Sequence, residues 1–404
     1  MPSGAQKENM KRVASIILAG GQGTRLHPLT KNRCKPSVSY GGKYRLIDIP
    51  ISNSLNAKIQ QIFIISQYFT TPLHQHIENT YHYFQNSKIK TLCPQEPWLE
   101  QIYFKGTADA IRKNIESFKR TTAEYFLILS GDQLYNFDFS EMFNFSLAED
   151  ADLTIACLPV NAKETKRMGI LKIDASNTVQ NFVEKPSSPP KEYLYKDEDH
   201  YLGSMGIYIF KRAALFALLE ETGDDFGKDL IPIQLKKGKT SAYIYKGYWE
   251  DIGTIGSYYA ANIALTKQKN CLNTYDELNP IFTKAHHLPN PLITDTTINQ
   301  SIIGQGAVIE AKEISNSIVG MRLKINKGTI IRHSILLETT LPAYTIGENC
   351  LLEKVILDEN SSIGNNVKLT NRENLEKFEG DGIFIRDGII IVTSGTKVPD
   401  NFIL

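Results

Sequence analysis

Residues 18–36 read LAGGQGTRLHPLTKNRCKP and follow the apolar run VASIIL at residues 13–18. The run predicts a buried strand, and the glycines after it predict a tight turn in which the backbone approaches a ligand. Backbone N–H groups in such a turn bind anions, while Arg25 and Lys35 add positive charge suited to phosphate. A strand-to-helix turn with a solvated basic flank is the alternative, but the added charge favours a phosphate-binding loop.

Two common phosphate-binding motifs do not fit this loop. It lacks the GK[ST] ending of a Walker P-loop, and Leu26 stands where the dinucleotide-binding fingerprint has its third glycine. The glycines Gly20, Gly21 and Gly23 therefore predict a phosphate-binding loop of another class.

The composition is that of an ordinary globular protein, and the length predicts two domains. The chain has 404 residues, 42% hydrophobic and 22% charged, with a net charge of +1. So small a net charge gives no overall field to attract nucleic acid or a membrane surface, and neither is an expected partner. Five cysteines lie far apart without a CxxC pair, and no apolar run approaches the roughly 20 residues needed to cross a bilayer. The N-terminus also lacks the apolar core of a signal peptide, so we expect a cytoplasmic protein.

The first two-thirds of the chain alternates short apolar runs with amphipathic stretches, which predicts a mostly parallel sheet with helices on both faces. The expected strands are Val13–Leu18, Ile62–Ser66, Tyr125–Ser130, Leu153–Leu158 and Gly206–Phe210. Helical spacing is seen in Leu73, Ile77, Tyr81 and Phe84, and again in Ile111, Ile115 and Phe118. In α/β sheets of this kind ligands bind beyond the carboxyl ends of the strands, so the loops there should carry the chemistry.

Past about residue 285 a six-residue period replaces this alternation. Branched apolar residues recur at one phase, often before glycine, as in IIGQGA, TIGENC and SIGNNV. Such a period is typical of a parallel β-helix, although isoleucine-rich hairpins are an alternative. We expect loops where the period breaks, near Glu310–Ile314 and Glu338–Tyr344. The predicted organisation is a first domain over residues 1–265, a proline-containing linker over 266–291 and a β-helix over 292–404.

Two aspartates follow apolar runs in the first domain. Asp132 lies in LSGDQLY and Asp251 in GYWEDIGT. Mg²⁺ takes oxygen ligands and usually only one or two from the protein, so two converging carboxylates would form a magnesium site. A turn aspartate that caps the next element is the alternative for each, and the sequence alone cannot bring the two together.

Other motifs suggest contacts with a sugar phosphate. FVEKP places Glu184 beside Lys185, where an ammonium could hold a phosphate and a carboxylate could accept sugar hydroxyls. Judged on this motif alone, a surface ion pair before the proline-rich loop PSSPP is the favoured interpretation. YFKGTADAI predicts a helix that starts near Thr107, preceded by Tyr103 and Phe104, which stack on a ring or fill the core.

The histidines give no convincing site. His74, His76 and His82 lie on the polar side of one helical pattern without further Cys or His ligands, so we reject zinc there. His333 in the β-helix raises the possibility of an acyltransferase, but a lone histidine in such a coil is more often structural.

Taken together and in this order, the motifs resemble the ADP-glucose pyrophosphorylases (glucose-1-phosphate adenylyltransferases). The resemblance spans nearly the whole chain and includes LAGGQGTRLHPLT, GTADAI, LSGDQLY, FVEKP, SMGIYIF, DFGKDLIP and YWEDIGT. Single fragments occur in many sugar nucleotidyltransferases, whereas the combination of GTADA, SMGIYIF and DFGKDLIP points to the ADP-glucose branch. The resemblance implies a Rossmann-like catalytic domain, then a left-handed β-helix, in a homotetramer.

The resemblance also implies roles for residues at matching positions. Arg25 and Lys35 would bind and polarise the triphosphate of ATP, and Asp132, with Asp251, would hold Mg²⁺. The positions implied for glucose 1-phosphate are Phe104, Gly169, Glu184, Lys185, Ser204 and Asp229. Those implied for the adenine are Leu18, Ala19, Gly20, Gly21, Gln67 and Gly106.

The implied reaction joins ATP and glucose 1-phosphate into ADP-glucose and diphosphate, which feeds glycogen-type α-glucan synthesis. Two alternatives are a nucleotidyltransferase for another base or sugar, and a non-catalytic regulatory subunit. A regulatory subunit would be expected to lack some of the charged residues implied in catalysis, and Arg25, Lys35, Asp132 and Lys185 are all present.

The chain departs from the family at several positions, some of them in the implied effector site. Asn32 stands where lysine is frequent, and Thr393 and Ser394 stand where many relatives have a basic residue. Tyr103 replaces a frequent tryptophan, while Arg45, also implied in effector binding, is retained. We therefore expect a weak or altered response to sugar-phosphate or nucleotide effectors.

Overall fold

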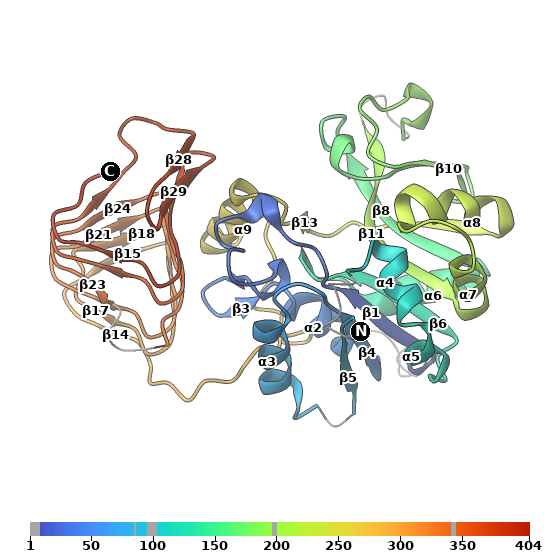
Figure 1. Ribbon diagram of the computed structural model, residues 1–404, viewed down its shortest axis with the longest axis horizontal. Helices are drawn as coiled ribbons and strands as arrows, with labels where there is room; N and C mark the ends of the chain where they lie inside the picture. Colours follow the sequence, from blue (N-terminus) through green and yellow to red (C-terminus); the bar gives the residue numbers. More distant parts are fainter. Residues whose placement is uncertain (1–8, 85, 95–102, 196–199, 341–344) are drawn as a thin grey trace.

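The computed structural model describes residues 9–84, 86–94, 103–195, 200–340 and 345–404. Figure 1 shows an α/β unit that contains the N-terminus and a coil of short strands that contains the C-terminus. Helix α9 (Ile255–Lys267) lies on the side of the α/β unit that faces the coil.

A nine-stranded mixed sheet forms the centre of the α/β unit. Its strands are β1 (Val13–Leu18), β4 (Gln61–Ile65), β5 (Lys88–Leu92), β6 (Tyr125–Ser130), β8 (Leu153–Val160), β9 (Ile170–Ile173), β10 (Val179–Val183), β11 (Tyr201–Lys211) and β12 (Thr240–Ile244). The order is β10-β9-β11-β6-β1-β4-β5, with β8 beside β11 and β12 beside β8. Strands β6, β1, β4 and β5 run parallel, so their carboxyl ends share one edge of the sheet. The α/β architecture predicted from the sequence is confirmed.

Helices cover both faces of this sheet. They are α2 (Asp48–Asn56), α3 (Thr70–Tyr81), α4 (Thr107–Lys113), α5 (Ile115–Lys119), α6 (Phe139–Ala148), α7 (Arg212–Leu219), α8 (Ile231–Lys237) and α9. Successive residues of β1 enter different cores, Ile16 on one face and Ile17 on the other, which explains why the strand reads as a continuous apolar run. In the described part of the chain, none of the helices has both the length and the apolar character that crossing a bilayer requires.

The C-terminal unit is a three-sided coil in which parallel strands stack along each side. One side contains β14 (Leu292–Ile293), β17 (Val308–Ile309), β20 (Lys324–Ile325), β23 (Thr345–Ile346), β26 (Ser362–Ile363) and β31 (Lys397–Val398). The second contains β15 (Thr297–Asn299), β18 (Glu313–Ser315), β21 (Ile330–Arg332), β24 (Leu351–Glu353) and β27 (Lys368–Leu369). The third contains β16 (Ile302–Ile303), β19 (Ile318–Val319), β22 (Ile335–Leu336), β25 (Val355–Leu357), β30 (Ile389–Val392), β29 (Ile383–Arg386) and β28 (Lys377–Glu379). On this side β29 and β28 extend the parallel stack as antiparallel strands.

The six-residue period places one inward apolar residue on each side of the coil. Ile309, Ile325 and Ile331 are fully buried in its core, as the period predicts. The prediction of a loop at Glu310–Ile314 is wrong, because this segment continues into strand β18 and Ile314 is fully buried. Of the second break, Glu338–Tyr344, residues 341–344 lie outside the described part of the chain.

The third side of the coil is buried on both faces. Its inward residues fill the coil, while the outward Ile318, Ile335, Ile356 and Ile391 belong to the core of the α/β unit. The two units therefore share a continuous apolar seam. Helix α9, which contacts β19 and β22, lies beside it. Residues 268–291, all of them described, contain no helix or strand and lead from α9 to β14. The boundaries expected at residues 265 and 292 remain predictions.

Candidate active site

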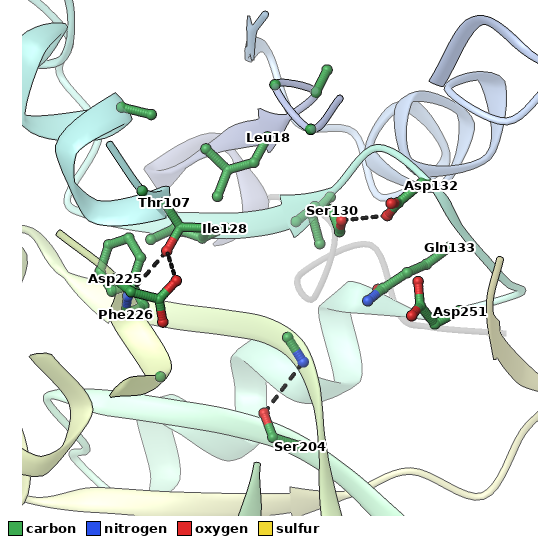
Figure 2. Close-up of a pocket in the computed structure, with 18 of the residues that line it drawn as sticks. Leu18, Thr107, Ile128, Ser130, Asp132, Gln133, Ser204, Asp225, Phe226 and Asp251 are labelled. Carbon is green, nitrogen blue, oxygen red and sulfur yellow. Dashed lines mark hydrogen bonds between the residues drawn. The ribbon is translucent and has the colours of Figure 1, made fainter. Parts of the chain in front are cut away.

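A cavity of about 490 Å³ opens at the carboxyl ends of the parallel strands. Leu18 at the end of β1 and Ser130 at the end of β6 line it (Figure 2). Gln67, just after β4, lines it too. This is the edge of the sheet at which the strand pattern placed the ligand site.

Most of the residues expected to act in the site line this one cavity. They are Leu18, Ala19, Gly20, Gly21, Arg25, Lys35, Gln67, Phe104, Gly106, Asp132, Gly169, Glu184, Lys185, Ser204 and Asp251. Of the expected residues, Asp229 and Arg45 are not among those that line it.

The two aspartates meet because two short strands pair as a separate sheet beside the large one. Strand β13 (Trp249–Asp251) runs antiparallel to β7 (Gln133–Tyr135), and Asp251 lies opposite Gln133, the residue after Asp132. Figure 2 shows both carboxylates at the same end of the cavity. Between them lies Lys35, whose Nζ is 2.6 Å from Oδ2 of Asp132 and 3.6 Å from Oδ1 of Asp251.

The charges of Lys35, Asp132 and Asp251 shift the pKa values of Lys35 and Asp251. Burial raises the pKa of the Asp251 carboxyl, and the negative charge of Asp132 raises it further, although Lys35 and Arg25 oppose the shift. Burial alone would lower the pKa of Lys35, but attraction to Asp132 and Asp251 outweighs it and the pKa lies above its ordinary value. Lys35 therefore carries a full positive charge at neutral pH, in a site where a phosphate could replace a carboxylate as its partner.

The donor set at this point fits a magnesium ion better than a transition metal. Asp132 and Asp251 offer only hard carboxylate oxygens, and Mg²⁺ is typically held by one or two carboxylates together with substrate phosphates. Within the described ranges, no cluster of three or more His, Cys, Asp or Glu side chains is arranged to hold a metal ion.

The glycine-rich loop is folded so that its two cationic residues face the cavity. Gly23 has a φ of 67°, a left-handed conformation that suits glycine, and the short 3₁₀ turn Thr24–Leu26 that contains Arg25 begins there. A second 3₁₀ turn, Lys35–Ser37, begins with Lys35 itself. The loop after β1 therefore contributes positive charge from both of its ends.

Gln67 joins two walls of the cavity. Its Nε2 donates a hydrogen bond to the carbonyl of Gly20 at 2.8 Å, and its Oε1 accepts one from the backbone N–H of Phe104 at 2.6 Å. Both ends of the side-chain amide are therefore used within the chain, and Gln67 fixes the spacing between the glycine-rich loop and the segment before α4.

Glu184 and Lys185 form another wall, at the end of β10. Lys185 has a φ of 44°, a conformation that costs a non-glycine residue energy and often marks a functional position. Its Nζ lies 3.0 Å from Oε1 of Glu184, and the lysine side chain is 59% exposed. Glu184 also lies close to Gly227, since a Cβ added at Gly227 would be 2.4 Å from its Oε2.

The structure adds residues that the sequence analysis did not single out for this role. Asp225 and Phe226 line the cavity, and Thr107 links to both, since its Oγ1 donates to Asp225 at 3.1 Å and accepts from the N–H of Phe226 at 3.0 Å (Figure 2). The carboxylate of Asp229 instead accepts the N–H groups of Asp224 and Asp225 at 2.9 and 3.0 Å. In DDFGKD, therefore, Asp225 faces the cavity and Asp229 shapes the turn that presents it.

Further lining residues come from segments around the acid pair. Arg167, Gln133 and Trp249 all border the cavity. Gln133 donates to the carbonyl of Met205 at 2.8 Å and accepts from Trp249 at 3.3 Å, so it joins β7 to β11 and β13. The charge of Arg167 was a signal available in the sequence, but no motif marked it.

Arg45 lies outside the cavity, in the seam between the two units. Its guanidinium donates to the carbonyl of Ser37 and lies 3.5 Å from Glu359 and 3.7 Å from Glu338, both in the coil. Arg45 is therefore already partnered by carboxylates of the same chain.

Comparison with known families agrees with this geometry. Residues 14–268 match the family described as nucleotidyl transferase, and residues 286–403 match the GLGC left-handed parallel β-helix domain. The chain belongs to the nucleotidyl transferase family. The combination of this domain with the GLGC β-helix is the signature architecture of the ADP-glucose pyrophosphorylase family members, so the resemblance drawn from the motifs is confirmed. Nucleotide and sugar-phosphate substrates follow from that membership, and such enzymes generally use a divalent metal such as Mg²⁺.

Proposed function

We propose that the chain is a glucose-1-phosphate adenylyltransferase, which converts ATP and α-D-glucose 1-phosphate into ADP-glucose and diphosphate. The observation that carries the proposal is the contact of Lys35 with both Asp132 and Asp251, in one cavity with Lys185. A triphosphate and a sugar phosphate both carry several negative charges, and this cavity supplies cationic side chains from two separate walls.

The chemistry is a direct displacement. A phosphate oxygen of glucose 1-phosphate forms a bond to the α-phosphorus of ATP, the bond from that phosphorus to the bridging oxygen breaks, and diphosphate leaves with the electron pair. The sugar phosphate is already an anion, so no proton has to be removed from it. Arg25 and Lys35 offset charge on the triphosphate, while Lys185 holds the sugar phosphate and Glu184 accepts its hydroxyl groups.

Asp132 and Asp251 would hold Mg²⁺, with phosphate oxygens and water as its remaining ligands. When bound, the ion neutralises charge that develops on the phosphate oxygens. The chain's own part is to keep the two carboxylates together through the β7–β13 pairing and to present Lys35 between them.

The base is assigned to adenine near Leu18–Gly21, Gln67 and Gly106 on the strength of the family resemblance. Product analysis with glucose 1-phosphate and Mg²⁺ against ATP, dTTP, UTP and GTP tests this assignment. We expect ADP-glucose to form at least tenfold faster than any other sugar nucleotide. Faster turnover with UTP or dTTP than with ATP would contradict the assignment of adenine as the base. No turnover with any of the four nucleoside triphosphates would favour a regulatory subunit.

We also propose an altered effector response. Arg45 is engaged by Glu338 and Glu359, and the positions of Asn32, Thr393 and Ser394 carry no positive charge. An assay with and without fructose 1,6-bisphosphate, fructose 6-phosphate or 3-phosphoglycerate should show little change in rate. Strong activation by one of them would refute this part of the proposal.

A homotetramer in the cytoplasm, serving glycogen-type α-glucan synthesis, completes the proposal. Light scattering on the purified chain tests the assembly, with an expected mass four times the 45.5 kDa of one chain. A monomeric mass would contradict it.

A further inference from the structure

One arginine of the glycine-rich loop is held by the coil rather than by the α/β unit. The guanidinium of Arg33 donates to Asp358 and lies 2.7 Å from Oε1 of Glu359, while its Nε donates to the carbonyl of Leu29 at 2.9 Å. Only 8% of Arg33 and 3% of Asp358 are exposed. Each nitrogen of the guanidinium therefore has a partner, two of them in the coil and one within the loop.

Arg33 lies close in sequence to the two cationic residues that face the cavity. Arg33 is two residues before Lys35, and Leu29 lies between Arg33 and Arg25. Holding Arg33 and Leu29 together therefore fixes the part of the loop between the two cationic residues that face the cavity. A buried guanidinium cannot move without its carboxylates, because an unpaired charge in the protein interior is strongly unfavourable.

The coil also anchors the other side of the Lys35–Asp251 contact. Asp387, in the turn between β29 and β30, accepts a hydrogen bond from the backbone N–H of Gly256 at 2.8 Å. Gly256 is in the first turn of α9, which begins four residues after Asp251. The same unit thus fixes the segments that supply Lys35 and Asp251, across the apolar seam next to α9.

From this geometry we infer that Asp358 and Glu359 are positioning residues for nucleotidyl transfer: by holding Arg33 they set the loop that brings Lys35 to Asp132 and Asp251. The β-helix domain then contributes to binding of the triphosphate without touching it. The inference rests on the proposed function, because it takes the triphosphate to be the ligand of Arg25 and Lys35.

The test compares Asp358→Asn and Glu359→Gln with a matched control in the same domain. Glu313→Gln removes a carboxylate that pairs with Arg332 through two contacts of 2.8 and 2.9 Å, on the surface of the coil away from the loop. Each variant is assayed well below its unfolding temperature, with the nucleoside triphosphate that the wild type turns over. Glu359→Gln removes one partner of Arg33 and leaves Asp358, so it serves if Asp358→Asn does not fold.

We expect kcat/KM for the triphosphate to fall at least tenfold in Asp358→Asn and about threefold in Glu359→Gln. KM for the sugar phosphate should change less than twofold in both, and Glu313→Gln should match the wild type. Equal losses toward both substrates, or no loss in a folded variant, would overturn the inference, since a purely structural contact predicts one of these.

A binding measurement separates this inference from the proposed function. Calorimetric titration with inorganic diphosphate and Mg²⁺ needs neither the correct base nor the correct sugar. Binding at least tenfold weaker in Asp358→Asn than in the wild type supports the positioning role even if the adenylyl assignment fails. Equal binding in the two proteins, or none in the wild type, contradicts it.

Discussion

Replacing Gly106 with alanine should move one wall of the cavity without adding or removing a charge. The backbone at Gly106 is extended, with φ at −170°, so alanine causes no conformational strain there. The obstacle is steric, because a Cβ would lie 2.3 Å from the carbonyl oxygen of Asp224 and 2.8 Å from its carbonyl carbon. These are backbone atoms, and they cannot swing aside as the end of a flexible side chain can.

The size of the effect follows from these distances. Restoring an ordinary contact of 3.4 Å requires a shift of about 1 Å between Gly106 and Asp224. The oxygen of Asp224 accepts the N–H groups of Ala108 and Asp109 at 2.8 and 3.2 Å, so the shift weakens two hydrogen bonds. Their loss costs about 1–3 kcal/mol in the free energy of unfolding. Asp225 follows directly and lines the cavity, and a displacement of this size can lower the rate by on the order of 100-fold.

Steady-state kinetics together with thermal unfolding tests this prediction. We expect Gly106→Ala to lower kcat/KM for both substrates by roughly 10- to 100-fold, by the displacement argument above, while the protein stays folded at the assay temperature. Gly364→Ala is the matched control, since its Cβ would lie 2.6 Å from the backbone nitrogen of Asp400 within the coil. It should lower stability by a similar amount and leave KM unchanged. Full activity in Gly106→Ala, or equal kinetic losses in both variants, would refute the reasoning.

Three further substitutions test separate parts of the account. Asp132→Ala should reduce turnover by about 100-fold or more, since it removes a carboxylate that holds the metal, with an unchanged circular dichroism spectrum; substantial residual activity would remove Asp132 from the metal site. Lys185→Ala should raise KM for glucose 1-phosphate by about tenfold, the pattern of lost ground-state binding, and KM for ATP much less, whereas equal increases would count against its role. Burial and the negative charge of Glu359 raise the pKa of Glu338 in the folded protein. The contribution of Glu338 to folding stability is therefore fully present at pH values below the ordinary pKa of a glutamate, and it is lost as the pH rises through the raised pKa of the folded state. Glu338→Gln should therefore raise the unfolding temperature at pH 8 and change it little at pH 4, and a lower unfolding temperature at pH 8 would contradict the pKa shift.

The fold could be predicted well where one local pattern decides the structure. The apolar runs at Val13–Leu18 and Tyr125–Ser130 are strands with those bounds, because each is buried on both faces. The six-residue period likewise gave the stacked coil. The expected loop at Glu310–Ile314 was wrong because the coil tolerates a shorter corner there and keeps its core position at Ile314.

The sequence also contains a signal for the seam between the two units, although no motif marks it. On the third side of the coil, adjacent residues are both apolar, as in Ile318–Val319 and Ile335–Leu336, because one side chain points inward and the other packs on the α/β unit. On the first side a polar residue often precedes the inward one, as in Lys324–Ile325. Doubled apolar residues in a β-helix therefore indicate a covered face.

The residues of the candidate site could be predicted from the sequence, but their arrangement in space could not. Motifs named Asp132 and Asp251 separately, and only the long-range pairing of β7 with β13 brings them to Lys35. The choice between Asp225 and Asp229 also depends on tertiary contacts, since one bonds to Thr107 and the other to its own turn. No periodicity in the sequence distinguishes these two aspartates.

The coupling of two substrates in one cavity is measured most directly by the stoichiometry of the reaction. The assay uses glucose 1-phosphate labelled in its glucose. It quantifies, in the same samples, the diphosphate released from ATP and the label recovered in the sugar nucleotide, and a parallel reaction omits glucose 1-phosphate. The account predicts one diphosphate for each ADP-glucose and none without the sugar phosphate. Diphosphate release that does not need the sugar, or that leaves the label in glucose 1-phosphate, would contradict it.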